Sequence, residues 1–211
     1  MSDLNVLVLK TILAGLAGYL LGSINTSIIV GKIMGVDIRK KGSGNAGATN
    51  TLRTLGKKAA IIVALGDVLK GIIACTAGML LTGNVENAGN PGLMAGGTCA
   101  VVGHNWPLYF GFRGGKGIFT SLAVVMMMDW RIGLILLGIF IIIVALTRYV
   151  SLGSVIASLL FPFTAAIKPF SHPPLFLVFA AVIAVLAVVR HSSNIVRLLK
   201  GTENKLSFHK K

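Results

Sequence analysis

Long apolar runs recur along the whole chain, separated by short stretches of charge, glycine and proline. A helix needs about 20 predominantly apolar residues to cross a bilayer. Only 12% of the residues are charged, compared with about 25% in a typical soluble domain, so the chain lacks the polar residues to cover a water-facing surface. The sequence therefore predicts an all-α integral membrane protein.

The apolar runs predict seven transmembrane helices, the fourth of them short. Their predicted bounds are Val6–Val30, Ala59–Leu81, Leu93–Phe112, Ile118–Met128, Ile132–Thr147, Ser151–Ile167 and Pro174–Val189. Seven crossings use most of the 211 residues, because each takes about 20. We therefore expect a single transmembrane domain over residues 1–211.

Basic residues are distributed unevenly between the two sides that this topology defines. Sixteen of the 20 Lys and Arg residues fall on one side, including Lys210 and Lys211 in the C-terminal tail, and the other side has only Lys10, Arg131 and Lys168. Cytoplasmic loops carry the excess of Lys and Arg, so we expect the N-terminus outside and the C-terminus in the cytoplasm. The net charge of +14 is typical of contact with anionic lipid. Nucleic acid is excluded as a partner, since no aromatic residues interleave with the basic runs.

The first polar cluster is a glycine-rich run on the basic side. Glycines allow positive φ, so several backbone N–H groups can turn toward one point. Side chains of the run can add donors, and Arg53 follows within one helical turn. This pattern is typical of a phosphate cradle, although a flexible connecting loop is the alternative. The run is Gly42, Ser43, Gly44, Asn45, Ala46, Gly47, Ala48, Thr49 and Asn50.

The second cluster combines a histidine with another glycine run. Gly103, His104 and Asn105 are followed by a loop in which Gly114, Gly115 and Gly117 surround Lys116. The loop offers N–H groups beside a cation at a predicted helix start, where the helix dipole favours anions. It is not a Walker A loop, because Gly117 stands where that motif has Ser or Thr. The alternative for His104 is a buried histidine with satisfied hydrogen bonds.

The third cluster ends the last predicted helix. On a continuing helix His191, Asn194 and Arg197 would share one face. A basic helix end at the membrane surface accounts for Arg197 but leaves His191 and Asn194 unexplained.

Asp67 and Lys70 stand three residues apart inside the second predicted span. Such a pair is either functional or a lock between helices. From the sequence, no carboxylate is placed to orient either His104 or His191.

Together the three clusters resemble the bacterial membrane-integral glycerol-3-phosphate acyltransferases that use acyl phosphate as donor, the PlsY family. The resemblance implies acyl transfer to the 1-hydroxyl of glycerol 3-phosphate, giving 1-acyl-glycerol 3-phosphate and phosphate in phospholipid biosynthesis. It implies a multi-pass protein of the bacterial inner membrane with its active site facing the cytoplasm. The His-x4-Asp pattern of other acyltransferases is missing, as expected for this family.

The resemblance also suggests roles for individual residues. The predicted catalytic residues are Ser43, Arg53, Lys116, His191 and Asn194. The predicted substrate-binding residues are Gly44, Asn45, Gly47, Ala48, Thr49, Asn50, His104, Asn105, Gly114, Gly115 and Ser154. Neither a metal nor another cofactor is required by these motifs. The partners are acyl phosphate, glycerol 3-phosphate and membrane lipids, and a monomer is favoured, although the oligomeric state is open.

A transporter of a phosphorylated or anionic solute is the alternative function. It would place its anion sites near the bilayer midplane, at broken helices and in two related halves. Here the sites cluster on one side, and no repeat between the halves is visible.

Overall fold

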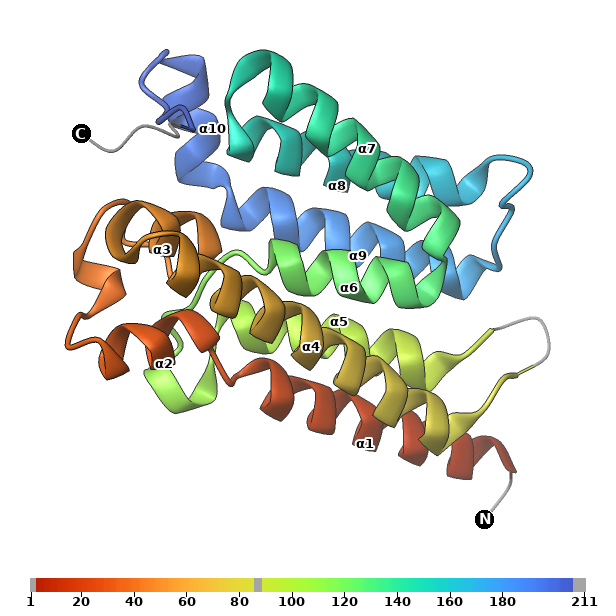
Figure 1. Ribbon diagram of the computed structural model, residues 1–211. Coiled ribbons are helices and arrows are strands. Elements are labelled where there is room, and N and C mark those ends of the chain that lie inside the picture. Colours follow the sequence, from red (N-terminus) through yellow and green to blue (C-terminus); the bar gives the residue numbers. More distant parts are fainter. Residues whose placement is uncertain (1–2, 86–88, 207–211) are drawn as a thin grey trace. The chain divides into compact units, whose positions relative to one another are not determined.

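The protein is described from a computed structural model, in which residues 3–85 and 89–206 are described. The described chain is helical apart from its loops and a single bridge between Val85 and Gly89 (Figure 1). It divides into two compact units, Met1–Met128 and Asp129–Lys211. A single domain over residues 1–211 therefore stays a prediction. Lys210 and Lys211, predicted for the basic tail, lie outside the described residues.

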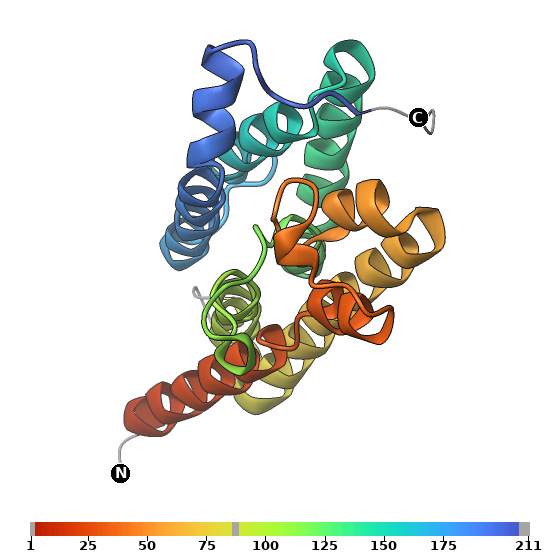
Figure 2. The ribbon, with the colours of Figure 1, turned by 90° about the vertical axis from the view of Figure 1, so that its left-hand side faces the viewer.

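Unit 1 is built around a buried central helix. Thirteen of the fifteen residues of α5 are buried, and α5 packs against α1, α4 and α6 (Figure 1, Figure 2). The elements of unit 1 are α1 (Asp3–Gly22), α2 (Thr26–Ile33), the 3-10 helix η1 (Ile38–Lys40), α3 (Ala48–Leu55), α4 (Lys57–Thr82), α5 (Pro91–Asn105), the 3-10 helix η2 (Leu108–Phe110) and α6 (Ile118–Met128).

Small residues let these helices approach closely. A Cβ on Gly18 of α1 would overlap the backbone of Gly96 in α5, and a Cβ on Gly78 of α4 would overlap Gly92. In lipid, helices associate through this close van der Waals packing, because apolar burial gains little there. The packing fixes α5 between its neighbours and so positions His104, next to last in α5.

Unit 2 consists of α7 (Trp130–Thr147), α8 (Val150–Ala166), α9 (Pro174–Arg190) and α10 (Ser192–Leu199). Within it α8 packs against α7 and α9. The chain bends by 60° between α9 and α10, and Figure 2 shows α10 turned away from the axis of α9. Asp129 caps the N-terminus of α7 by accepting a hydrogen bond from the Arg131 N–H at 2.9 Å.

Three stretches of the described residues are long and apolar enough to cross a membrane by themselves: Asp3–Ile33, α4 and α7. The bent pair of α9 and α10 is a fourth if it is counted as one span, and α6 and α8 are apolar but shorter. The protein is thus a helical multi-pass membrane protein, while the number of seven spans stays a prediction. The structure has one helix at each of five predicted spans, the second, fourth, fifth, sixth and seventh. The ends of these helices differ from the predicted ends by at most two residues.

The other two predicted spans are not single helices: the first lies within the candidate span Asp3–Ile33, and the third ends early as a helix. Val6–Val30 is interrupted, because Asn25 caps α2 by accepting a hydrogen bond from the Ile28 N–H at 3.1 Å. Leu93–Phe112 ends as a helix at Asn105, since Pro107 follows two residues later and disfavours helical backbone in the residue before it.

Candidate active site

The first glycine loop lies between η1 and α3 and is held by Asn50. The side chain of Asn50 is 1% exposed. Its oxygen accepts a hydrogen bond from the Ser43 N–H at 2.8 Å, and its amide donates to the carbonyls of Ile38 and Lys41 at 3.1 and 3.0 Å. The expectation that Asn50 offers a donor to a ligand is corrected, because both amide hydrogens serve the loop backbone.

The rest of the first loop leads into the start of α3. Gly42 and Gly44 have φ of 58° and 72°, values that favour glycine. Ser43 is exposed, whereas Asn45, Gly47 and Thr49 are half-buried and Ala48 is buried. Gly47 precedes α3 without a capping side chain, so the positive end of the helix dipole is not covered by a side-chain cap. Arg53 is exposed in the last turn of the same helix.

The second glycine loop packs tightly onto the end of α5. The Gly115 N–H donates to the carbonyl of His104 at 3.1 Å, and a Cβ on Gly114 would overlap that carbonyl. One predicted N–H donor is therefore used within the fold. Lys116, half-buried, lies between Gly115 and Gly117, whose φ is 72°. These glycines were predicted for anion binding alone. The structure shows that close packing against α5 also requires them.

The two glycine loops meet at Gly115. A Cβ on this glycine would overlap both the carbonyl oxygen of Ala46, from the first loop, and Nε2 of His104. Only a glycine allows these three groups to lie so close together. The structure therefore brings together the first and second predicted motifs, which are far apart in the sequence.

A buried charged cluster lies beneath this junction. The ammonium of Lys70 makes an ion pair with Oδ1 of Asp67 at 2.9 Å and a hydrogen bond with Nδ1 of His104 at 2.8 Å. Oδ1 of Asp67 is 3.4 Å from the same Nδ1. All three residues are at most 6% exposed. The statement that no carboxylate is placed to orient either histidine is wrong for His104, because Asp67 lies on α4, which packs against α5.

Asn105 follows His104 and is fully buried. Neither polar atom of its side chain has a hydrogen-bond partner within residues 3–85 and 89–206, and its oxygen lies 2.9 Å from the position of a Cβ on Gly117. A buried amide without a partner is costly, which keeps Asn105 among the candidates for substrate contact.

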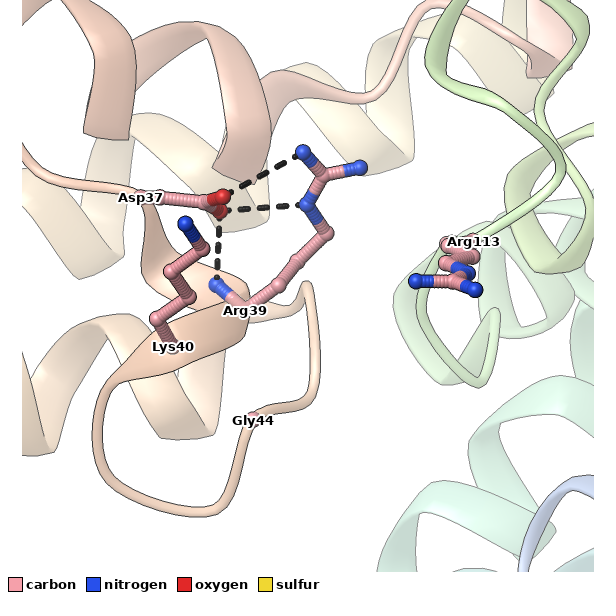
Figure 3. Close-up of a pocket in the computed structure, with 6 residues that line it drawn as sticks. Asp37, Arg39, Lys40, Gly44 and Arg113 are labelled. Atoms are coloured by element: carbon pink, nitrogen blue, oxygen red, sulfur yellow. Dashed lines mark hydrogen bonds and ion pairs between the residues drawn. The ribbon is translucent and has the colours of Figure 1, made fainter.

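A cation-lined cavity of about 490 Å³ opens beside both loops (Figure 3). Arg39 and Lys40 reach it from η1, and Arg113 faces them from the second loop. Asp37 binds Arg39 at 3.1 Å, and the hydrogen bonds from Arg39 hold the pKa of Asp37 below its usual value. The cavity wall is thus positive, with three cations and one paired carboxylate, and Gly44 and Gly114 complete it.

Arg39, Lys40 and Arg113 were missed as members of the site. The sequence places Arg39 and Lys40 directly before the first loop and Arg113 directly before Gly114. Their position next to the glycine loops could have indicated that these residues belong to the site. Basic residues are equally typical of any cytoplasmic loop, however.

In unit 2 the predicted residues lie around the bend at His191. Nδ1 of His191 donates to the carbonyl of Ala187 at 2.7 Å. The prediction that His191 and Asn194 share one face of a continuing helix is wrong, because α9 ends at Arg190 and the chain bends by 60°. Ser154 is buried in α8, and its hydroxyl donates to the carbonyl of Val150 at 2.9 Å.

Glu203 gathers the polar residues that follow the bend. It accepts hydrogen bonds from Asn194 at 2.7 Å, from Arg197 at 2.7 Å and from Ser151 at 3.0 Å. Burial raises the pKa of Glu203, but these hydrogen bonds outweigh the effect and leave the pKa below its usual value. Glu203 was not among the predicted site residues, although it follows the third cluster in the sequence.

No group of three or more His, Cys, Asp or Glu residues in the described ranges is placed to hold a metal ion.

The features above define a class of protein: a helical multi-pass membrane protein with a cationic, glycine-lined site suited to phosphate-bearing molecules. A family model described as glycerol-3-phosphate acyltransferase matches residues 12–201. The chain therefore belongs to the glycerol-3-phosphate acyltransferase family, an enzyme family, and the resemblance of its motifs is confirmed.

Proteins named glycerol-3-phosphate acyltransferase are similar over nearly the whole chain. The protein of Thermoanaerobacter sp. (strain X514) is 48% identical over 92% of this chain and 95% of its own length. That of Shouchella clausii is 47% identical over 95% of this chain and 98% of its own length. Both relatives are thus matched over nearly their whole length.

Two crystal structures of PlsY, an integral membrane glycerol 3-phosphate acyltransferase, are also similar. The glycerol 3-phosphate form has a TM-score of 0.85 at 36% identity, covering 93% of this chain and 96% of that chain. The lysophosphatidic acid form has a TM-score of 0.83, covering 93% and 95%. The similarity in fold therefore accompanies the similarity in sequence.

Proposed function

We propose that this enzyme transfers a fatty acyl chain from acyl phosphate to the 1-hydroxyl of glycerol 3-phosphate, giving lysophosphatidic acid and inorganic phosphate for phospholipid biosynthesis. The observation that carries this proposal is the contact of the two glycine loops at Gly115 and Ala46. Two loops suited to phosphate lie side by side there, beside a positively lined cavity. A reaction between two phosphate-bearing substrates needs such an arrangement.

The first loop is assigned to the acyl phosphate. Ser43, Asn45 and the backbone from Gly47 to Thr49 surround the start of α3, where a helix N-terminus favours an anion. Gly44, Ala48 and Asn50 shape this loop, Asn50 through its hydrogen bonds to the backbone. The acyl tail extends into lipid.

Glycerol 3-phosphate is assigned to the cations and polar side chains of the other motifs. Arg53, Lys116, His191 and Asn194 bind it, with Ser154 as a neighbour. Asn105, whose buried amide has no partner within the described residues, contacts the substrate. His104, Gly114 and Gly115 support the second loop, from which Lys116 extends. Arg39, Lys40 and Arg113 attract both anionic substrates to the cavity.

The reaction needs one bond made and one broken. The 1-hydroxyl oxygen attacks the acyl carbon, the bond from that carbon to the phosphate oxygen breaks, and the hydroxyl proton passes to the departing phosphate. Acyl phosphate is a mixed anhydride with a good leaving group, and the cations stabilise both that group and the developing oxyanion. The donor phosphate therefore acts as the base. Neither a metal nor a cofactor takes part in this scheme.

We further propose a monomer in the bacterial inner membrane, with seven spans, the N-terminus outside and the site facing the cytoplasm. The charge bias of the loops supports this orientation. Ser43→Cys, made after Cys75 and Cys99 are replaced by Ala, should react with a membrane-impermeant maleimide in inverted vesicles and not in intact cells. Labelling in intact cells would reverse the orientation.

The proposed reaction is tested by phosphate release from the purified protein. Palmitoyl phosphate and glycerol 3-phosphate are supplied together and singly, and palmitoyl-CoA then replaces palmitoyl phosphate. We expect phosphate release to need both substrates and to be lost in Ser43→Ala and Lys116→Ala. With palmitoyl-CoA we expect neither lysophosphatidic acid nor free CoA to form. Lys10→Ala, an exposed lysine of α1 far from both loops in sequence, is the matched control and should keep full activity.

The alternative, a transporter of an anionic solute, predicts a different outcome. Folded protein would then release no phosphate, and proteoliposomes would show flux of a phosphorylated solute. Formation of lysophosphatidic acid and free CoA from palmitoyl-CoA and glycerol 3-phosphate would instead retain an acyltransferase but contradict the acyl phosphate assignment.

A further inference from the structure

The buried lysine of α4 is surrounded by three acceptors. The ammonium of Lys70 lies 2.9 Å from Oδ1 of Asp67, 2.8 Å from Nδ1 of His104 and 3.1 Å from the carbonyl oxygen of Ile24. An ammonium has three N–H donors and no acceptor, so the acceptors match its capacity. Asp67 supplies the opposite charge that a buried ammonium requires.

This arrangement decides which nitrogen of His104 carries the proton. Because Lys70 can only donate, Nδ1 of His104 must accept, and an accepting ring nitrogen has no hydrogen. The neutral ring then carries its proton on Nε2. The partner of one ring nitrogen sets the state of the other, so Lys70 makes His104 a donor at Nε2.

Nε2 of His104 lies at the junction of the glycine loops. A Cβ on Gly115 would overlap Nε2 together with the carbonyl oxygen of Ala46. Ala46 and His104 are both buried. The Nε2–H group therefore lies beside the carbonyl of Ala46 in the first loop and the backbone of Gly115 in the second. A hydrogen-bond donor at this place can hold the two glycine loops together.

We propose that Asp67 and Lys70 are positioning residues, which hold His104 as its Nε2–H tautomer so that its ring fixes the junction of the two glycine loops. They act on catalysis through the loops and do not contact substrate. The proposal deepens the proposed function, and its kinetic test rests on that function, whereas the tautomer of His104 is measured without any substrate.

The tautomer is measured by nitrogen NMR of the full-length protein in detergent with ¹⁵N-labelled histidine. His104→Gln identifies the signals of His104 by their loss. We expect a pyrrole-type shift at Nε2 and a pyridine-type shift at Nδ1, and we expect this pattern to change in Lys70→Met. A proton on Nδ1 of His104 in the native protein, or a pattern unaffected by Lys70→Met, would overturn the proposal.

Two substitutions of His104 test the role of the Nε2 proton. The amide nitrogen of Gln reaches the position of Nε2 and can donate there. The oxygen of Asn reaches the position of Nδ1 and can accept from Lys70, but Asn offers no donor at Nε2. His104→Gln should keep kcat/KM within about threefold, whereas His104→Asn should lose about tenfold or more, which corresponds to the loss of one hydrogen bond.

The two tests separate the possible failures. Equal activity of folded His104→Gln and His104→Asn would show that the ring has only a packing role and would overturn the proposal. If the native enzyme released no phosphate, the proposed function would fail, and the NMR measurement would still decide the tautomer. If His104→Asn did not fold, the NMR measurement on the native protein would still decide the tautomer of His104, and a proton on Nδ1 would overturn the proposal.

Discussion

The two histidines of the predicted motifs, one in each unit, have opposite hydrogen-bond partners. Nδ1 of His104 accepts from the ammonium of Lys70, whereas Nδ1 of His191 donates to the carbonyl of Ala187. In its neutral form His104 therefore carries a proton on Nε2, and His191 carries a lone pair there. At Nδ1, a histidine is therefore an acceptor in unit 1 and a donor in unit 2, and the group that faces this nitrogen decides which.

The carboxylates of the two units differ in a related way. Asp67 is buried within α4 and acts on a histidine through Lys70. Glu203 follows α10 and binds Asn194 and Arg197 directly. The buried pair is the more demanding arrangement, since each of its charges depends on the other.

Asp67→Asn should have the largest effect on stability. It leaves the buried ammonium of Lys70 without an opposite charge, and removing one partner of a buried pair costs about 3 to 5 kcal/mol. The free energy of unfolding in detergent measures this. Asp67→Asn combined with Lys70→Met should cost less than the sum of the single variants; additive losses would contradict the pairing.

Glu203→Gln is the matched change in unit 2 and should cost less, about 1 to 2 kcal/mol, because a neutral acceptor remains and Arg197 is partly exposed. The lowered pKa of Glu203 adds a pH dependence. Its ionised form contributes stability above the pKa of the unfolded chain, and the contribution is lost as the pH falls through the folded pKa. Unfolding followed across acidic pH should show this loss in the native protein and not in Glu203→Gln.

His191→Ala should weaken glycerol 3-phosphate binding more than it slows turnover. We expect KM for glycerol 3-phosphate to rise about tenfold, with kcat changed by about threefold at most, because the donor phosphate takes the proton. Steady-state kinetics with both substrates varied measures the two constants. A kcat near zero with unchanged KM would instead make His191 the general base.

Asp129→Asn should have the smallest effect, about 1 kcal/mol or less, because Arg131, one of its two partners, is half exposed and the Asn oxygen can still accept a hydrogen bond from Arg131 or from His172. The hydrogen bond from Arg131 is the main factor that lowers the pKa of Asp129 to about 2. The stabilising charge is present above the unfolded pKa and is lost as the pH falls from about 4 to about 2. Thermal unfolding in acid should distinguish the native protein from the variant only above this range.

Much of the fold follows from local pattern. The predicted run Ile118–Met128 is helix α6 residue for residue, because an apolar stretch in lipid can satisfy its backbone only as a helix. The two predicted spans in which the helix is broken show the limit of this reasoning. At Asn25 a capping side chain inside an apolar run ends one helix and starts another, which hydrophobicity does not detect.

Part of the site also follows from pattern. The glycine runs and their cations identified both loops and the family, since few functions other than anion binding require those residue types together. Individual roles were less accessible. Asn50 resembled a ligand donor but holds its own loop, and no role was predicted for Glu203. A side chain's partner is often distant in sequence, and composition does not report it.

The amino-acid sequence by itself determined that this chain is a helical membrane protein with glycine- and cation-rich motifs, because hydrophobicity, glycine content and charge act locally. Only the tertiary structure decided that Lys70 meets a histidine 34 residues away and that Gly115 closes against Ala46. Those contacts depend on how closely α4 and α5 pack. Close approach is set by small residues on both helices at once, and no single stretch of sequence contains that information.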